Sequence, residues 1–226
     1  MIYENGASGV GYARCCSCET RAVAKPRWSW PASYRPLVAN EVICARLQGL
    51  LRVRGVAVNA PQGDVGRVYD SSRCPGVVKC FVMADVGEHC RIGPTAVIGS
   101  DAPWPSWLST FDRWVGRLDG NGETNLLLVA GRVVPVDWAL TFPWAASGPR
   151  NLIRAVNDTH SMPIHADVAL AAKRDAVEAL REIDDDAIWT AVIEDVSEDL
   201  LPASTATAYW SGLCLRRDLL IAEVQK

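Results

Sequence analysis

Residues 111–142, FDRWVGRLDGNGETNLLLVAGRVVPVDWALTF, contain the pattern on which the interpretation of this chain depends. From Trp107 to Leu118, apolar side chains recur at helical spacing, so this stretch predicts an amphipathic helix with a wide buried stripe. The helix is expected to end at Leu118, because the Asp-Gly-Asn-Gly run at 119–122 favours turns. A buried helix therefore leads into a polar loop.

A tight hairpin is expected after this loop. Two apolar segments, Leu126–Val129 and Arg132–Val136, flank Ala130-Gly131, and a two-residue connection of this kind joins antiparallel strands. If Ala130-Gly131 forms the centre of the turn, Asn125 lies across from Val136. The residue after Val136 then lies at the same end of the hairpin.

Three oxygen-bearing side chains, those of Asp119, Asn125 and Asp137, are thus expected to converge at the end of the hairpin. Phosphoryl transfer needs a carboxylate that orients the attacking hydroxyl, together with oxygen ligands for magnesium. Kinase-like folds use this order, with Asp119 as the catalytic carboxylate and Asn125 and Asp137 as metal ligands. The simpler alternative is a polar turn followed by an ordinary hairpin and a solvated aspartate.

The order of residues upstream favours the kinase interpretation. A glycine-bearing stretch at 6–11 precedes a short strand that ends in Lys25, and a helix from Leu37 to Leu51 carries Glu41. In kinases, a strand lysine paired with a glutamate of the next helix holds the nucleotide phosphates. Glu41 lies among apolar side chains, where a buried carboxylate requires a partner.

In these segments the chain resembles the HipA-like kinases, in particular the small stand-alone bacterial members of that family. The resemblance covers most of the chain, and its matching stretches are GVGYARCCSCETRAVAK at 9–25, LVANEVICARLQGLLRVRGVAV at 37–58, the stretch at 111–142 and the C-terminal region from Ile188. It implies an α+β, two-lobed protein-kinase-like fold that binds ATP and magnesium between its lobes. The small sheet-containing lobe would span 1–84, and the mostly helical lobe 85–226.

Carried over residue by residue, the resemblance implies a role for each matching position. Lys25 would contact phosphate with Glu41 as its partner, and Asp119 would be the catalytic carboxylate. Asn125 and Asp137 would bind magnesium. The nucleotide would contact the glycine loop and the strand and hinge at 78–85, through Gly6, Ser8, Gly9, Gly11, Phe81, Val82 and Met83. Ser8 matches a serine that is phosphorylated in some relatives.

Two departures from the family pattern leave alternatives open. Five residues separate Asp119 from Asn125 where relatives commonly have four, and Gly120 stands where relatives usually have a basic residue. The chain could therefore be a catalytically degenerate nucleotide-binding or interaction domain. A small-molecule kinase is another alternative, because antibiotic phosphotransferases share the same Asp, Asn, Asp order. A hydrolase with Asp119 and Glu123 as acid and base is a third, although their glycine-rich loop does not favour a raised carboxyl pKa.

The composition excludes several other classes of protein. With 26 acidic and 23 basic residues the net charge is −3, which argues against nucleic acid as the principal partner and leaves a protein or small-molecule substrate. No apolar run approaches the ~18 residues of a membrane span, and no secretion signal is recognisable, so a cytoplasmic location is expected. Cys15, Cys16 and Cys18 are interpreted as partly buried thiols, because no second pair has the spacing of a zinc site.

Overall fold

The structure is a computed structural model of the 226-residue chain. It describes residues 2–4, 11–14, 21–26, 36–69, 77–92, 102–118, 125–144, 166–194, 196 and 199–225.

The first sheet is formed by the N-terminal strands. Its order is β1-β2-β3-β5-β4, and a parallel pair between β1 and β4 closes it into a barrel. All other neighbours in this sheet are antiparallel. The strands are β1 (Ile2–Glu4), β2 (Gly11–Arg14), β3 (Arg21–Pro26), β4 (Gly63–Tyr69) and β5 (Val77–Ala84).

The register of this sheet places Lys25 near the end of β3, directly opposite Phe81 of β5. Ala13, Ala24 and Cys80 form a small buried cluster within the sheet. The strand expected to end in Lys25 is therefore confirmed, and it is an internal strand paired on both sides. Its backbone is fixed by two ladders, which holds the lysine at a defined position.

The second sheet contains the expected hairpin. It has the order β6-β7-β8, with β6 (Cys90–Arg91), β7 (Leu126–Val129) and β8 (Arg132–Pro135). Ala130 and Gly131 both have positive φ, 47° and 78°, as the central residues of a type I′ turn require. The Val136 N–H donates to the Asn125 carbonyl over 2.9 Å, so the predicted pairing of Asn125 with Val136 is confirmed.

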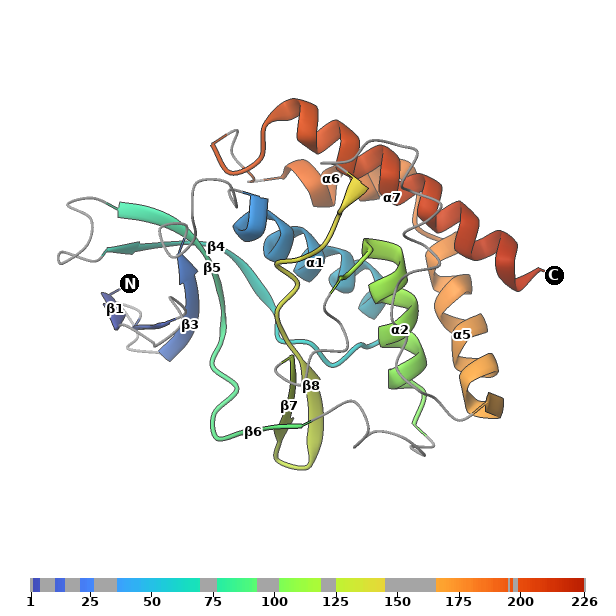
Figure 1. Cartoon of the computed structure of the whole chain (residues 1–226), viewed down its shortest axis with the longest axis horizontal. Coiled ribbons are helices and arrows are strands. Elements are labelled where there is room, and N and C mark those ends of the chain that lie inside the picture. The colour runs from blue at the N-terminus through green and yellow to red at the C-terminus, as the bar shows by residue number, and fades with distance from the viewer. Residues whose placement is uncertain are drawn as a thin grey trace.

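Five helices belong to the described residues: α1 (Pro36–Val53), α2 (Trp104–Val115), α5 (Ala166–Arg181), α6 (Asp185–Ile193) and α7 (Ala203–Val224). Figure 1 shows the first sheet at one end of the molecule and α2, α5 and α7 toward the other, with α1 between them. Helix α1 contacts β4 and β5 on one side and α5 and α6 on the other. It is the element that joins the sheet to the helices.

Helix α2 ends one turn earlier than the sequence predicts. Gly116 adopts a left-handed conformation with φ 67°, and its N–H donates to the Asp112 carbonyl, which terminates the helix. Leu118 was expected on the buried stripe, but it lies beyond this cap and is 59 % exposed. The prediction for Leu118 is wrong because the left-handed glycine redirects the chain.

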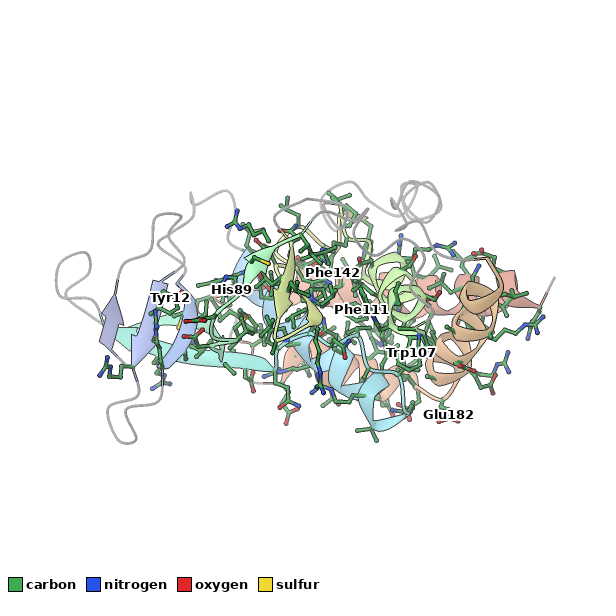
Figure 2. All side chains as sticks on the ribbon, turned by 90° about the horizontal axis from the view of Figure 1, so that it is seen from below. Tyr12, His89, Trp107, Phe111, Phe142 and Glu182 are labelled. Carbon is green, nitrogen blue, oxygen red and sulfur yellow. The ribbon has the colours of Figure 1, made fainter. Side chains whose placement is uncertain are left out.

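One apolar core extends through most of the molecule. It includes side chains from α1, β5, α2, the segment after β8 and the three C-terminal helices. Figure 2 shows the labelled Phe111 and Phe142 in the middle of this region, with Tyr12 at the sheet end and Glu182 at the helical end. The fold class is α+β, as predicted. Among the described residues, no helix combines the length and the apolar character that crossing a bilayer would need.

Candidate functional site

Three charged side chains from distant parts of the sequence meet where α1 passes the first sheet. Lys25 Nζ on β3 forms a buried ion pair with the Glu41 carboxylate on α1. The same nitrogen lies 3.0 Å from Asp137 Oδ1 in the segment after β8. The Lys25 cluster, as these three residues are called from here on, therefore links a strand, a helix and a hairpin.

The members of the Lys25 cluster differ in their access to solvent. The side chains of Glu41 and Lys25 are 3 % and 7 % exposed, whereas that of Asp137 is 35 % exposed. Asp137 also has a positive φ of 69°, which is uncommon outside glycine. A strained backbone that persists implies that its surroundings hold it firmly. Because its side chain is the most exposed of the three, Asp137 is the carboxylate that a ligand from solvent can reach.

Burial and charge act in opposite directions on these groups. Burial raises the pKa of Glu41 to about 7, with Lys25 opposing and Asp137 reinforcing the rise. Burial would lower the pKa of Lys25, but the two carboxylates outweigh it and raise that pKa above its usual value. Burial would also raise the pKa of Asp137, but Lys25 and a hydrogen bond with Glu41 hold it below its usual value. Asp137 is thus the ionised partner of Lys25 at neutral pH, while Glu41 titrates near neutrality.

The residues on either side of the polar loop, Leu118 and Asn125, are both bonded to the segment that carries Asp137. On one side, the Leu118 N–H donates to the Leu140 carbonyl over 3.0 Å. On the other side, Asn125 is buried and its carbonyl accepts from Val136. Asp119, the predicted catalytic carboxylate, lies outside the described residues.

Sequence reasoning missed Arg117, whose side chain is almost fully buried. Its Nη2 donates to the carbonyls of Val136 and Asp137 over 2.6 and 2.9 Å, and its guanidinium lies 4.6 Å from the Trp138 ring centroid. Asp112 of α2 accepts from the Trp138 indole N–H over 3.1 Å and lies 3.5 Å from Arg117 Nη1. The backbone around Asp137 is therefore held by α2 and the residues that follow it.

The predicted nucleotide contacts are placed in part. Gly6, Ser8 and Gly9 lie outside the described residues, and Gly11 is the first residue of β2. Phe81, Val82 and Met83 lie inside β5 and pair with β3 and β4 on its two sides, so their backbone groups are engaged in ladders. These three residues therefore belong to the strand part of the stretch at 78–85 that was expected to form a strand and a hinge.

The chain leaves the sheet after Ala84. Asp85 Oδ1 accepts from the Gly87 N–H over 3.0 Å, and Oδ2 lies 3.3 Å from Arg21 Nε of β3. Gly87 has φ 78°, so the turn uses a left-handed conformation that suits glycine. The first backbone beyond the β3–β5 ladder therefore belongs to Asp85–Gly87.

The cluster does not by itself form a closed metal site. Within the part of the chain that the structure describes, no group of three or more His, Cys, Asp or Glu side chains is arranged to hold a metal ion. Magnesium, however, is commonly bound through one or two protein oxygens that act together with substrate phosphates and water. The accessible carboxylate of Asp137 could supply one such oxygen. Asn125, which pairs with the residue before Asp137, could supply the second.

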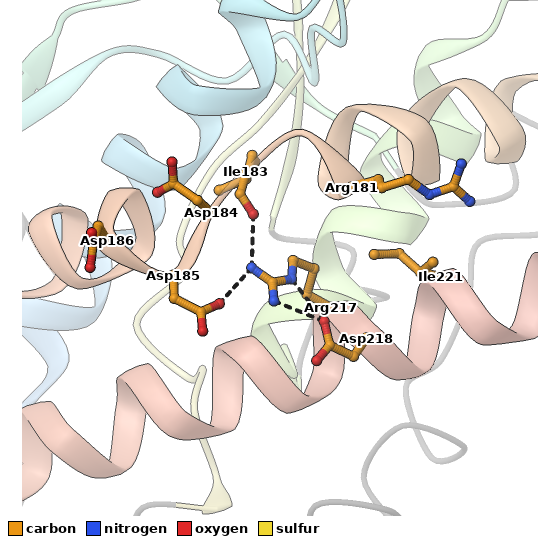
Figure 3. A pocket seen from close by; sticks show the side chains of 8 residues that line it. All are labelled: Arg181, Ile183, Asp184, Asp185, Asp186, Arg217, Asp218 and Ile221. Atoms are coloured by element: carbon orange, nitrogen blue, oxygen red, sulfur yellow. Dashed lines mark hydrogen bonds and ion pairs between the residues drawn. The ribbon is translucent and has the colours of Figure 1, made fainter.

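A separate open pocket of ≈ 550 Å³ lies where α5, α6 and α7 meet. Figure 3 shows Arg217 at its centre, bonded to Asp185, Asp218 and the Ile183 carbonyl. Asp184 caps α6 by accepting from the Ala187 N–H over 2.7 Å. These polar groups have structural partners, so the Lys25 cluster is the stronger candidate for chemistry.

A comparison with protein-family models and a comparison with curated proteins both find no match to this chain. Function is therefore inferred from the chemistry of the Lys25 cluster and its surroundings.

Proposed function

We propose that this protein is an ATP- and magnesium-dependent phosphotransferase similar to the HipA-like kinases, and that it transfers the γ-phosphate to a hydroxyl of a protein substrate. The observation that carries the proposal is the Lys25 cluster. A strand lysine, a glutamate of the following helix and an aspartate just after a hairpin are the three charged groups that kinases place around nucleotide phosphates.

Stability alone is a poor explanation for the Lys25 cluster. Burying an ion pair costs desolvation energy that its attraction often only balances. Here two carboxylates share one lysine, so the buried charges do not balance when Glu41 is ionised. Perturbed ionisable groups of this kind concentrate at functional sites. The partly exposed Asp137 gives such a site an opening to solvent.

The arrangement of the elements supports a two-lobed kinase-like fold. The closed first sheet and α1 would be the small lobe, and α2 with α5–α7 would be the core of the helical lobe. The adenine would then be held by the backbone of Asp85–Gly87, where the chain leaves β5. Asp85 is the last residue of the stretch at 78–85 that the sequence predicts to form the strand and hinge.

Each residue of the site has a defined task in the proposed reaction. Lys25 contacts the phosphates and Glu41 keeps the lysine in place. Asp137 and Asn125 contribute oxygen ligands, and bound magnesium would neutralise charge that develops on the phosphates. Asp119 orients the acceptor hydroxyl and takes its proton. Leu118 and Asn125, which flank Asp119 in the sequence, are both bonded to residues next to or shortly after Asp137.

A degenerate nucleotide-binding domain is the second candidate. Gly120 and the five residues between Asp119 and Asn125 are the observations that favour it, because they change the catalytic loop and leave the Lys25 cluster intact. Such a protein would bind nucleotide without releasing ADP. A small-molecule acceptor remains the alternative within kinases, and substrate screening distinguishes the two acceptor classes.

The test measures ADP release and protein-bound phosphate with magnesium-ATP. We expect activity in the wild type and its loss, by at least about a hundredfold, in Asp119→Ala and Asp137→Asn. Asp175→Asn is the matched control, because Asp175 is an exposed aspartate of α5. Nucleotide binding without ADP release would favour the degenerate domain. Wild-type activity that Asp119→Ala leaves intact would remove the assignment of the base, and absence of nucleotide binding would contradict both candidates.

A further inference from the structure

Asn40, the residue before Glu41 on α1, is buried and makes hydrogen bonds with two other elements. Its Nδ2 donates to the Ala139 carbonyl over 2.7 Å and lies 3.4 Å from the Thr141 carbonyl. Its Oδ1 accepts from the Tyr209 hydroxyl of α7 over 2.7 Å. The side chain is 3 % exposed, so water does not compete for these groups.

The chemistry of the partners determines which way the amide faces. A carbonyl oxygen only accepts hydrogen bonds, so the NH₂ group of Asn40 must face Ala139. The amide oxygen then faces Tyr209, whose hydroxyl donates to it. Aspartate at this position has no donor for the carbonyl, and leucine has neither group. The position therefore requires an amide of this length.

The geometry relates two members of the Lys25 cluster to each other. Successive residues of a helix point about 100° apart, so Glu41 faces Lys25 while Asn40 faces the segment after β8. Ala139 lies two residues after Asp137. The bond from Asn40 to Ala139 thus ties the helix that carries Glu41 to the segment that carries Asp137.

Tyr209 supports this link from the opposite side. Its ring packs on Phe142 with centroids 4.5 Å apart, and its side chain is 2 % exposed. Tyr209 therefore contacts the same segment through its ring and α1 through its hydroxyl. One residue of α7 stabilises both the orientation of the Asn40 amide and the segment to which that amide binds.

We propose that Asn40, oriented by Tyr209, is a positioning residue that sets the Asp137 carboxylate against Lys25 and Glu41. Its consequence for catalysis rests on the proposed phosphotransferase function. Without the link, the residues after Asp137 can shift relative to α1, and the carboxylate then binds magnesium less well. A merely structural hydrogen bond would lower stability without this selective effect.

The test uses Tyr209→Phe, which keeps the aromatic contact with Phe142 and removes only the hydroxyl. Thr110→Val is the matched control, because Thr110 is buried on α2 and, among the described residues, its hydroxyl bonds within that helix, to the Ser106 carbonyl. Asn40→Leu, which has a similar volume, provides a second variant. Thermal melting temperatures show whether the stability losses of Tyr209→Phe and Thr110→Val are comparable.

The first measurement is amide hydrogen exchange at 136–142 without nucleotide. We expect exchange about five- to tenfold faster in Tyr209→Phe, as loss of one buried hydrogen bond implies, with little change in β4 and β5. Thr110→Val should leave 136–142 unchanged. Equal exchange at 136–142 in Tyr209→Phe and Thr110→Val would overturn the proposal, and Asn40→Leu must repeat the effect of Tyr209→Phe.

The second measurement is the magnesium concentration that gives half-maximal ADP release. We expect it to rise severalfold in Tyr209→Phe and to stay at the wild-type value in Thr110→Val. An unchanged magnesium requirement together with faster exchange would limit Asn40 to a structural role and overturn its positioning role. If the wild type releases no ADP, the phosphotransferase proposal fails, while the exchange measurement still decides whether Asn40 holds the Asp137 segment.

Discussion

The backbone N–H of Leu118 donates to the carbonyl of Leu140 over 3.0 Å, although Leu118 follows α2 and Leu140 follows the hairpin. A second bond, from Phe142 N–H to the Val115 carbonyl, is also 3.0 Å long. The chain after α2 thus runs beside the chain after β8. This pairing brings Leu118, the residue before the polar loop, to the segment that carries Asp137.

Arg117 is expected to be the main side-chain support of this pairing. Arg117→Met would remove a donor from the carbonyls of Val136 and Asp137 and a cation from the side of Asp112, and breaking a buried charge interaction typically costs about 3–5 kcal/mol. Urea unfolding measures the decrease in the free energy of unfolding. Arg174→Met, at an exposed position of α5, should change stability by less than about 0.5 kcal/mol. Similar decreases in stability in Arg117→Met and Arg174→Met would contradict the supporting role of Arg117.

Glu41 should give the protein an unusual pH dependence. Its folded-state pKa is raised from 4.5 to about 7, so the folded protein binds the proton more tightly than the unfolded chain. The stability that this provides is complete below pH 4.5 and is lost as the pH rises through 7. The stability of the wild type relative to Glu41→Gln should therefore decrease between pH 4.5 and 7.

Melting curves of the wild type and Glu41→Gln at several pH values test whether the relative stability of the wild type decreases as the pH rises. Asp137 titrates below its usual value and Lys25 above its usual value, so neither group contributes a slope in the same pH window. If the relative stability of the wild type instead rises between pH 4.5 and 7, Glu41 is an ordinary ionised partner of Lys25.

The hairpin and the buried pair could be predicted because the sequence itself contains their local signals. Ala130-Gly131 between two apolar runs is a turn signal, and Glu41 on an apolar helix requires a cation. The strand β4 was not recognised, because Gly63–Tyr69 contains two glycines and charged residues and is held by its pairing with β5. Strand formation there depends on the partner strand more than on intrinsic propensity.

Asn40 and Arg117 could not be assigned from sequence for a related reason. Each has a local signal, an amide beside Glu41 and an arginine just before the polar loop. Their partners, however, are backbone carbonyls of residues after β8, and any amino acid supplies a carbonyl. Only the tertiary arrangement shows which carbonyls are left for these side chains. Their polar character in apolar surroundings could have marked both as buried residues, but it does not indicate their partners.

Gly212 should be intolerant of any side chain. A Cβ there would lie 2.0 Å from Trp144 Nε1, and that indole is held by a 3.0 Å bond to the Ala208 carbonyl. The ring also has little room toward Gly116, where a Cβ would lie 2.7 Å from it. We expect Gly212→Ala to destabilise the protein by about 1–3 kcal/mol, because the Trp144 ring cannot move away from the added methyl group.

Gly49→Ala on α1 is the matched control, since a Cβ there meets no atom within 4 Å. Alanine favours helix, so Gly49→Ala should stabilise the protein by up to about 1 kcal/mol. Urea unfolding of both variants tests this contrast. Stabilisation by Gly212→Ala would mean that Trp144 does not pack against α7.

Glu223 should respond to pH in the sense opposite to Glu41. It joins three helices, with Arg113 of α2 at 2.5 Å and Lys173 of α5 at 2.7 Å. Hydrogen bonding by Arg113, with help from Lys173, lowers its pKa to about 2. The stability that it provides is therefore present above pH 4.5 and is lost as the pH falls through 2.

Glu223→Gln should destabilise the protein at pH 7 by no more than about 1 kcal/mol, because the Glu223 side chain is 42 % exposed and water screens its ion pairs. High salt should reduce the difference further, whereas salt should have little effect on the buried pair of Lys25 and Glu41. Glu88→Gln, at an exposed position, is the control. Guanidinium is itself a salt, so the measurement uses urea unfolding at low and high sodium chloride. A loss for Glu223→Gln that salt leaves unchanged would show that the carboxylate acts through shielded hydrogen bonds instead of exposed ion pairs.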